Sequence, residues 1–566
     1  MTETIPPPLQ PPTSKERKYD RQLRLWAATG QRALEESHIL LVNSGPGVVG
    51  VETLKNLVLP GIGNFTILDD ALVCEADLGV NFFLDEDSLG SSRAEQCCRL
   101  LQELNPDVSG NFIAEPTTRF LDRPDSLQPF TLILLTSPVD PTVFSRIAEH
   151  GCSTQTPVFF IHSLGFYSEF SVQLPAAFPI IDTHPDPTAL NDLRILKPWP
   201  ALEQLAHEFC GDLDQLDDHD HGHIPYVALL LHFVEKWKAA HGGNPPENYA
   251  EKSEYRKLIY AAQRRDNPER GEENYMEAYE TALKSLNAAT IRSSVRDVFE
   301  APECKSLATD SAPFWVIANA VSQFHSKHGV LPLSGSLPDM KAQSADYVKL
   351  QTVYRAKFRE DAAEILGTVR ALERSLRKPN AIPGSSIDIF CKNAAHIKLV
   401  RGSTIRPMNP DGPFKWTDRA KAAATSLLDE TSLFPIHVAF VAYDQFVSLS
   451  AADAGKKRFR APGAGDETAH DETDMIALAD QILSHVFKQA GQLSYSKEDL
   501  AAAKGRVYDT VREVVRAGGA ELHNIAALTG GLIAQEVIKV VTEQYIPIDN
   551  TCIFDGIRSK TEVHRL

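Results

Sequence analysis

The fold is decided at residues 38–50, which read His38-Ile-Leu-Leu-Val-Asn-Ser-Gly-Pro-Gly-Val-Val-Gly50. An apolar, β-rich run ends in glycines spaced G-x-G-x-x-G, at Gly45, Gly47 and Gly50, and a helical pattern follows over 51–59. Asp69 ends the next apolar run. In nucleotide-binding α/β folds such glycines let the backbone approach phosphates, the helix N-terminus offers free N–H groups, and the acid holds a ribose hydroxyl.

Two residues in this loop weaken the nucleotide interpretation. Pro46 has no backbone N–H to donate, and Val48 puts a branched side chain where close approach is needed. A tight strand-to-helix turn that serves packing alone explains the same spacing. The pattern therefore predicts the fold more firmly than it predicts nucleotide binding at Gly45, Gly47, Gly50 and Asp69.

The rest of the chain divides into two kinds of pattern. Further buried strands are predicted at 130–136 and 157–162, with a helix at 93–104, so strands alternate with helices and predict a parallel, doubly wound sheet. Long amphipathic helices dominate from Pro225 to about Arg377. A segment rich in Gly, Ala and charge at 451–474 predicts an exposed loop, before a helix at 475–489.

Near the C-terminus the α/β character returns. An apolar helix is predicted from Gly530 to Thr542 and strand material from Ile546 to Phe554. The simplest arrangement is one nucleotide-binding-type domain built from both chain ends, with a mainly helical insertion between them.

Composition excludes several classes. The 566 residues carry 57 Lys and Arg against 75 Asp and Glu, a net charge of −18, which argues against nucleic-acid binding and against an anionic membrane surface. The N-terminus lacks a signal-peptide core, and no apolar run approaches a membrane span. Eight cysteines without a C-x-x-C pair indicate reduced thiols, so we expect a cytoplasmic or nuclear protein.

Other candidate sites have plainer explanations. Residues 217–223, Asp-Asp-His-Asp-His-Gly-His, have metal-ligand types, but a polar turn capping a helix that starts at Pro225 explains them equally well. Cys304 beside Lys305 is a weak candidate thiol nucleophile, since no base is placed near it. His162 ends a buried strand and is expected to be a structural histidine, and at least one of Cys97 and Cys98 is expected in the core.

One further segment, Tyr19-Asp-Arg-Gln-Leu-Arg-Leu-Trp26, is amphipathic and carries Arg21 and Arg24 beside an aromatic anchor. From the residues alone, a solvated face over a packed Trp26 explains it.

In combination these motifs resemble the activating enzymes for ubiquitin-like proteins. The resemblance rests on Tyr19–Trp26, the glycine loop, the run from Leu57 to Asp69, and Gly530-Gly-x-x-Ala-Gln-Glu-Val-Ile-Lys, and it covers nearly the whole chain. Within that family the chain is most similar to regulatory subunits of the heterodimeric type that acts on the Nedd/Rub modifier. The resemblance implies a Rossmann-like adenylation-type domain formed by both chain ends.

The resemblance also implies a division of labour. The catalytic partner binds ATP and Mg²⁺, adenylates the modifier and carries the cysteine that passes it as a thioester to a conjugating enzyme, while this chain holds no cofactor or metal. The implied partners are that catalytic subunit and the Nedd/Rub modifier, with the conjugating enzyme as a further candidate. The implied domains are a disordered tail at 1–14, an inactive adenylation-type domain at 15–166 and 511–566, and a helical module at 167–510 without the catalytic cysteine.

This sequence departs from the pattern of active subunits at the adenylation site. Val80 stands where a phosphate-binding Arg is expected, and Asn81 replaces a Gln. The expected Mg²⁺-binding Asp, five residues before Arg146, is Pro141, and Asp140 is one place off. The glycine loop and Asp69 are therefore expected to be vestigial. Arg21 is intact, and the resemblance implies that it reaches the partner's ATP phosphates in trans.

Three alternatives remain open. The glycine loop and Asp69 alone are also typical of an NAD(P)-dependent oxidoreductase. That interpretation does not explain the Tyr19–Trp26 segment or the segment that begins at Gly530. A self-sufficient adenylating enzyme conflicts with Val80 and with the missing Asp. A pure scaffold would retain the fold for dimerisation with no contribution from Arg21.

Overall fold

The computed structural model describes residues 11–185, 192–266, 271–286, 290–405, 416, 419–454, 460–466, 468–491 and 493–566. These residues form two compact units, one containing 1–178 and 400–566 and the other 179–399. The first ten residues of the predicted tail lie outside the described residues. Residue 14 does not belong to a disordered tail, because Thr13 caps a short helix that begins at Ser14.

The first unit is built from both ends of the chain. Its N-terminal segment contains α1 (Ser14–Lys18), α2 (Asp20–Glu35), β1 (His38–Val42), α3 (Val48–Val58), β2 (Asn64–Leu68), α4 (Glu75–Leu78), η1 (Glu86–Ser88), α5 (Arg93–Leu104), β3 (Ser109–Ile113), α6 (Thr117–Leu121), β4 (Leu132–Thr136), α7 (Pro141–Thr154), β5 (Val158–Leu164) and β6 (Tyr167–Gln173). Its C-terminal segment contains α18 (Ala420–Leu428), α19 (Phe434–Ala454), α20 (Thr468–Ala490), α21 (Lys497–Ala517), α22 (His523–Thr542), β9 (Thr551–Asp555) and β10 (Lys560–His564).

The eight-stranded sheet of this unit has the order β10-β9-β6-β5-β4-β1-β2-β3. The strands β5, β4, β1, β2 and β3 are parallel, as predicted. The prediction of a parallel, doubly wound sheet is thus confirmed for the strands on which it rested, and the sheet becomes mixed where β6, β9 and β10 run antiparallel. The reason is local: β5 and β6 are joined through Gly165 and Phe166 alone, and so short a connection makes a hairpin, not a crossover.

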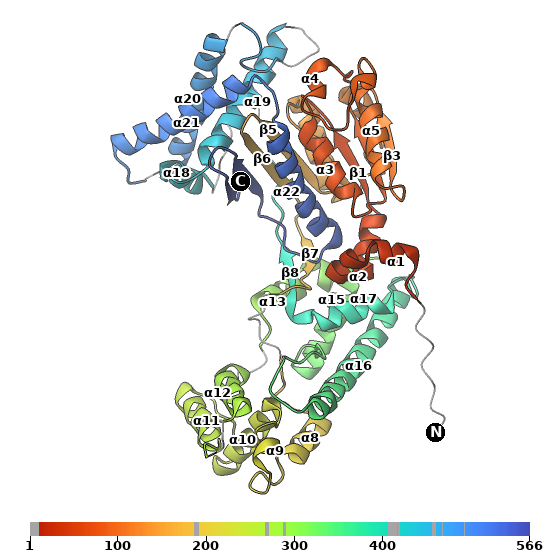
Figure 1. Cartoon of the computed structure of the whole chain (residues 1–566), viewed down its shortest axis with the longest axis vertical. Coiled ribbons are helices and arrows are strands. Elements are labelled where there is room, and N and C mark those ends of the chain that lie inside the picture. Colours follow the sequence, from red (N-terminus) through yellow and green to blue (C-terminus); the bar gives the residue numbers. More distant parts are fainter. Residues whose placement is uncertain are drawn as a thin grey trace. The chain divides into compact units, whose positions relative to one another are not determined.

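Helices cover the sheet in layers. Along β1, Leu40 and Val42 belong to the core shared with α6 and α7. Leu41 points the other way, toward Gly50 of α3. Figure 1 shows α3, α5 and α22 side by side over this face of the sheet. The alternation along β1 therefore separates two cores, and both are needed to bury the central strand.

Helix α22 packs on α3 at very short range. A Cβ added to Gly530 would lie 2.8 Å from the backbone nitrogen of Thr53 and 2.9 Å from the carbonyl carbon of Glu52. In the described part of the chain, α22 alone is long and apolar enough to cross a membrane, with a mean hydropathy of 1.4. Most of that window is buried inside the protein, against α3 and β6. Its apolar character thus belongs to a core helix.

Helices α18–α21 form a further core, which includes Leu164, Tyr167 and Ile553 of the sheet. The predicted exposed loop at 451–474 is confirmed only in part: the described residues 460–466 form a loop, but α19 continues to Ala454 and α20 begins at Thr468. Charged residues in this stretch are not all solvated. Asp471 is buried and accepts hydrogen bonds from both terminal nitrogens of Arg460, at 2.8 and 2.6 Å. Residues 455–459 and 467 lie outside the described residues.

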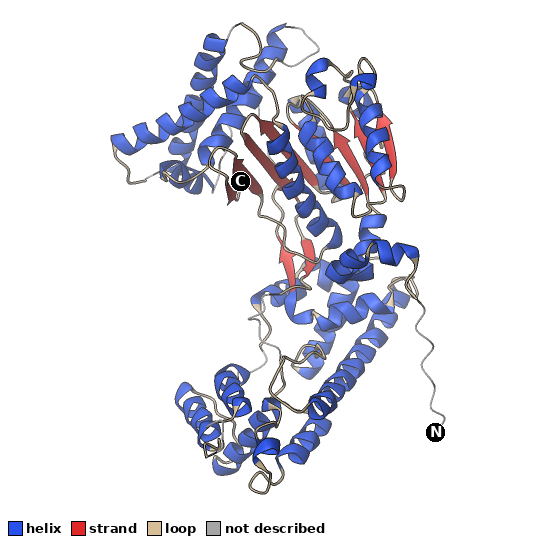
Figure 2. Cartoon of the chain, viewed as in Figure 1, coloured by secondary structure: helices blue, strands red, loops and turns tan. Residues whose placement is uncertain are grey.

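The second unit is almost entirely helical (Figure 2). It contains α8 (Pro200–Cys210), α9 (Asp218–His221), α10 (Tyr226–Ala240), α11 (Tyr249–Ala261), α12 (Glu273–Ser285), α13 (Ser293–Glu300), α14 (Pro302–Lys305), α15 (Pro313–His328), α16 (Ser344–Ser375), α17 (Gly384–Lys392) and η2 (Ala394–His396), while β7 (Phe178–Ile181) pairs with β8 (Ile397–Val400). The predicted run of helices from Pro225 is confirmed. The functional division at 15–166, 167–510 and 511–566 stays a prediction, distinct from these compact units.

The contact between α22 and α3 gives a matched test. Gly530→Ala is expected to destabilise the protein by about 1–3 kcal/mol, because the new methyl group meets backbone atoms that cannot move aside. Gly531→Ala faces no atom within 4 Å and is expected to be neutral or stabilising by up to about 1 kcal/mol. Urea denaturation of both variants measures the difference. Equal stabilities for the two would contradict this packing.

Candidate functional site

The glycine loop connects β1 to α3. Gly45 and Gly47 have φ values of 59° and 67°, in the left-handed region where residues with a side chain are strained. A Cβ on Gly47 would lie 2.2 Å from the side-chain amide nitrogen of Asn43, and one on Gly50 would lie 2.7 Å from Leu41. The loop thus needs its glycines for its own geometry, in keeping with the packing interpretation.

The N-terminus of α3 has a carboxylate in front of it. One carboxylate oxygen of Glu521 accepts a hydrogen bond from the Val48 N–H at 3.0 Å, and the other accepts from the Val49 N–H at 2.8 Å. Glu521 is 4% exposed and is held beside β5 by a bridge to Gly165. In a nucleotide-binding fold these N–H groups are free for phosphate. Sequence reasoning missed Glu521, because nothing in the local pattern links it to a loop more than 470 residues away.

Asp69 is also occupied from within the protein. Its Oδ2 accepts hydrogen bonds from Arg93 Nε at 2.7 Å and from Asn43 Nδ2 at 3.0 Å, and its Oδ1 accepts from the Ala71 N–H at 2.9 Å. The structure therefore brings Asp69 beside the glycine loop, as predicted. Both of its oxygens, however, already accept hydrogen bonds from groups of the protein itself.

Arg93 links the parts of this loop region. Besides Asp69, its guanidinium contacts the Asp77 carboxylate at 3.3 Å and donates to the Pro46 carbonyl oxygen at 3.2 Å. Burial opposes the charge of Arg93, but the neighbouring carboxylates of Asp69 and Asp77 outweigh it and raise its pKa. The positive charge that faces the loop is thus neutralised internally and is not presented to a ligand.

The positions that depart from active subunits serve structural roles here. Asn81 is buried, where its Oδ1 accepts from the Phe83 N–H at 2.9 Å, and Val80 beside it is half-buried. The Asp140 carboxylate caps α7 by accepting from the Thr142 N–H at 2.8 Å. Val80 and Asn81 carry no charge for phosphate, and the Asp140 carboxylate is engaged as a helix cap.

Helix α2 presents Arg21 at the surface. Tyr19, just before the helix, is buried, and its hydroxyl accepts from Asn105 Nδ2 at 3.0 Å. At the other end the indole N–H of Trp26 donates to Gln31 Oε1 at 3.1 Å. Within the described residues Arg21 has no ion pair or hydrogen bond, whereas Arg24 pairs with Asp20 at 2.9 Å.

A break in α2 isolates the turn that carries Arg21. Trp26 has φ −121° and ψ 17°, and Ala27 has φ 55° and ψ −178°, so the helical conformation is interrupted there. The side chain of Gln544 donates to the Trp26 carbonyl oxygen at 2.9 Å and so satisfies a group that the break leaves without a helical partner. The segment Tyr19–Leu25 is thus a short helix anchored by an aromatic residue on each side, and Arg21 projects from it.

The histidine-rich turn does not present its residues together. Asp217, His219 and Asp220 are exposed and close enough to share a cation, but Asp217 caps α9 by accepting from the Asp220 N–H at 2.8 Å. His221 points inward, where its Nδ1 lies 2.7 Å from Glu272. The predicted cap of a helix starting at Pro225 is wrong, because within the described residues no side chain caps α10, and Asp217 instead caps the short helix α9.

The remaining candidates are structural. Burial raises the pKa of the Cys304 thiol to about 11, although Lys305 lowers it, so a nucleophilic thiolate is not favoured. His162 lies 2.9 Å from Asp444 and is buried, as expected of a structural histidine. Burial opposes its protonation, but Asp444 and Glu169 outweigh this and raise its pKa. Cys97 and Cys98 are both buried.

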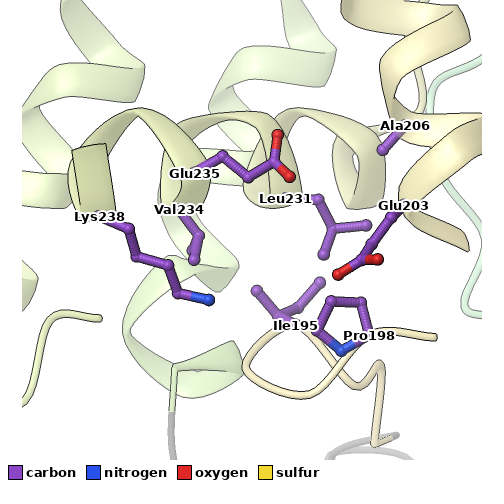
Figure 3. Close-up of a pocket in the computed structure, with 8 residues that line it drawn as sticks. All are labelled: Ile195, Pro198, Glu203, Ala206, Leu231, Val234, Glu235 and Lys238. Carbon is purple, nitrogen blue, oxygen red and sulfur yellow. The ribbon is translucent and has the colours of Figure 1, made fainter. Parts of the chain in front are cut away.

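A shallow pocket lies in the helical unit, between α8 and α10. Figure 3 shows its aliphatic floor and the charged groups beside it. The residues that line it are Ile195, Pro198, Glu203, Ala206, Leu231, Val234, Glu235 and Lys238. Its charged residues are Glu203, Glu235 and Lys238, and none of the sequence-predicted site residues lines it.

Known proteins resemble this chain over nearly its whole length. The ThiF family matches residues 19–566. The NEDD8-activating enzyme E1 regulatory subunit of Xenopus laevis is 34% identical over 559 residues, which cover 98% of this chain and 99% of that protein. The regulatory subunit AXR1 of the same enzyme in Arabidopsis thaliana is 34% identical over 558 residues, with coverage of 97% and 96%.

Glu521 makes the loop sensitive to pH. Burial raises its pKa from 4.5 to about 7, although the Val48 and Val49 N–H groups and Arg93 lower it. The folded state therefore binds this proton more tightly than the unfolded state. The stability contributed by Glu521 is complete below about pH 4.5 and is lost as the pH rises through about 7.

We therefore compare the wild type with Glu521→Gln, which does not titrate. Between pH 4.5 and 7, the wild type is expected to lose about 3 kcal/mol of unfolding free energy relative to the variant. Urea denaturation across this range measures the difference. Parallel pH profiles would mean that the carboxyl does not change charge there.

Proposed function

The chain belongs to the ThiF family and, within it, to the NEDD8-activating enzyme E1 regulatory subunits, and from this premise we propose that it is a regulatory subunit that acts only with a catalytic partner. The enzyme they form adenylates the Nedd/Rub modifier with ATP and passes it as a thioester to a conjugating enzyme. The observation that carries the proposal is the 34% identity over nearly the full length of both chains.

In this proposal the adenylation chemistry belongs to the partner. Adenylyl transfer depends on positioned positive charge and Mg²⁺ around the phosphates. Here Glu521 already accepts from the N–H groups at the start of α3, and Asp69 neutralises Arg93. These residues do not fit ATP and Mg²⁺, so we assign both to the catalytic subunit. The helical module at 167–510 and its place beside the partner's cysteine remain part of the proposal.

Arg21 is proposed to complete the partner's site in trans. A guanidinium is always charged and grips two phosphate oxygens at once. In the described part of the chain, Arg21 is exposed and without a partner, and the short helix that carries it is anchored at Tyr19 and Trp26. A charge held in a fixed place needs no reorganisation when negative charge develops on the transferring phosphoryl group.

The alternatives find less support. The family and the near full-length match do not favour an oxidoreductase or a self-sufficient adenylating enzyme. The remaining alternative is a scaffold to which Arg21 contributes nothing. The Arg21→Ala experiment below distinguishes that scaffold from our proposal. We place the heterodimer in the cytoplasm or nucleus, because all eight cysteines are free thiols.

The test of the function is ATP–pyrophosphate exchange with the Nedd/Rub modifier. We expect no exchange by this chain alone, because its own loop lacks the charges that adenylation needs, and modifier-dependent exchange once a catalytic subunit is added. Exchange by the chain alone would identify it as an adenylating enzyme. Silence in both samples would refute the assigned partnership.

Arg21→Ala is expected to lower the exchange rate of the heterodimer by about 10²-fold, because one stabilising donor to the transition state is lost. The affinity between the subunits, measured by titration, is expected to change little. Arg24→Ala, one helical turn away, serves as the control because Arg24 already pairs with Asp20. Equal rates for wild type and Arg21→Ala at limiting ATP would leave only the scaffold interpretation.

A further inference from the structure

The start of α3 is an anion-binding site by its construction. The helix has eleven residues, its N-cap is Gly47 with no capping side chain, and the N–H groups of Val48 and Val49 point out of its first turn. The positive end of the helix dipole lies at the same place. A helix N-terminus of this kind lacks local partners, so whatever anion lies there comes from elsewhere.

In this protein the anion comes from the far end of the chain. The two oxygens of Glu521 each accept from one N–H group, at 3.0 and 2.8 Å, which is the two-oxygen, two-donor arrangement of a phosphoryl group at such a loop. We propose that Glu521 is the internal ligand of this anion site, and that its ionised carboxylate keeps phosphate groups out of the glycine loop. The inference rests on the loop alone and does not depend on the partner or the modifier.

The surroundings of Glu521 hold it in this position. It lies in the short connection between α21 and α22, where Gly165 and Glu521 form a bridge and the Gly165 N–H donates to the Ala520 carbonyl oxygen at 2.9 Å. Two residues further on, α22 begins and packs against α3. The carboxylate is therefore fixed from both sides and is 4% exposed, so it is not a side chain that swings freely between solvent and the loop.

An incoming phosphate would have to replace Glu521. Its oxygens need the same two N–H groups, and Pro46 supplies no further backbone donor to the loop. Two anions in one buried site would also repel each other strongly. Phosphate is therefore expected to bind to the loop once the carboxylate is removed. Such binding would distinguish a Glu521 that acts as an internal ligand from a Glu521 that only fills space.

The test uses the full-length chain alone at pH 8, where the carboxylate is ionised, with inorganic phosphate as the probe. Phosphate at about ten times its dissociation constant is expected to raise the melting temperature of Glu521→Ala by about 1–3 °C relative to chloride at equal ionic strength. The wild type is expected to show no such rise. Direct binding of phosphate, followed by ³¹P line broadening, is expected in the variant only.

Asp140→Ala is the matched control, because Asp140 also caps a helix through two N–H groups but lies outside the glycine loop. It is expected to give no phosphate response. If Glu521→Ala does not fold, Glu521→Gln keeps the size and one acceptor oxygen while losing the charge, and a smaller rise is expected. A phosphate response as large in the wild type as in the variants, or none in either variant, would overturn the proposal.

Discussion

The close approach of α22 to α3 at Gly530 is the constraint on which the first unit depends. Because Gly530 has no side chain, the backbones of a helix from each chain end come into contact. Residues on both sides of α22 make contacts with the N-terminal segment. Glu521 precedes the helix and meets the loop of α3, while Gln544 follows it and meets the carbonyl group of Trp26. The fold, the occupied loop and the break that isolates Arg21 thus share one cause.

The polar groups of the glycine loop are satisfied by other residues of the same protein and not by a nucleotide. Its N–H groups bind Glu521, its acidic residue binds Arg93, and Asn43 fills the space between the glycines. Each ligand group that a nucleotide would bring is matched by a side chain of the protein itself. The loop region is thus stabilised by groups of the protein itself, while Arg21 lies exposed at the surface of the same unit.

The sequence predicts the local elements of this unit well and the long-range contacts poorly. The strand at His38–Val42, the loop and the helix at Arg93–Leu104 carry strong periodic patterns, and they lie within a few residues of their predicted positions. The apolar runs do not predict β6 or the antiparallel direction of β9, because these depend on the hairpin at Gly165 and on pairing between distant parts of the chain. Glu521 could not be found at all, since its partner is distant in sequence and is the backbone, which carries no residue signal. The sequence predicts the helix that begins at Arg93, but the burial of Arg93 against Asp69 depends on tertiary packing.

The separation of α3 from α22 along the chain has a consequence for synthesis in the cell. Roughly 480 residues lie between the end of α3 and the end of α22. At a translation rate of about 5–20 residues per second, the apolar face of α3 waits roughly 25–100 s for the helix that covers it. During that time the apolar surface that α22 will cover stays exposed on the nascent chain while the residues of the helical unit are synthesised. The order of the elements along the chain thus means that the N-terminal segment cannot complete its core until the last part of the protein has been made.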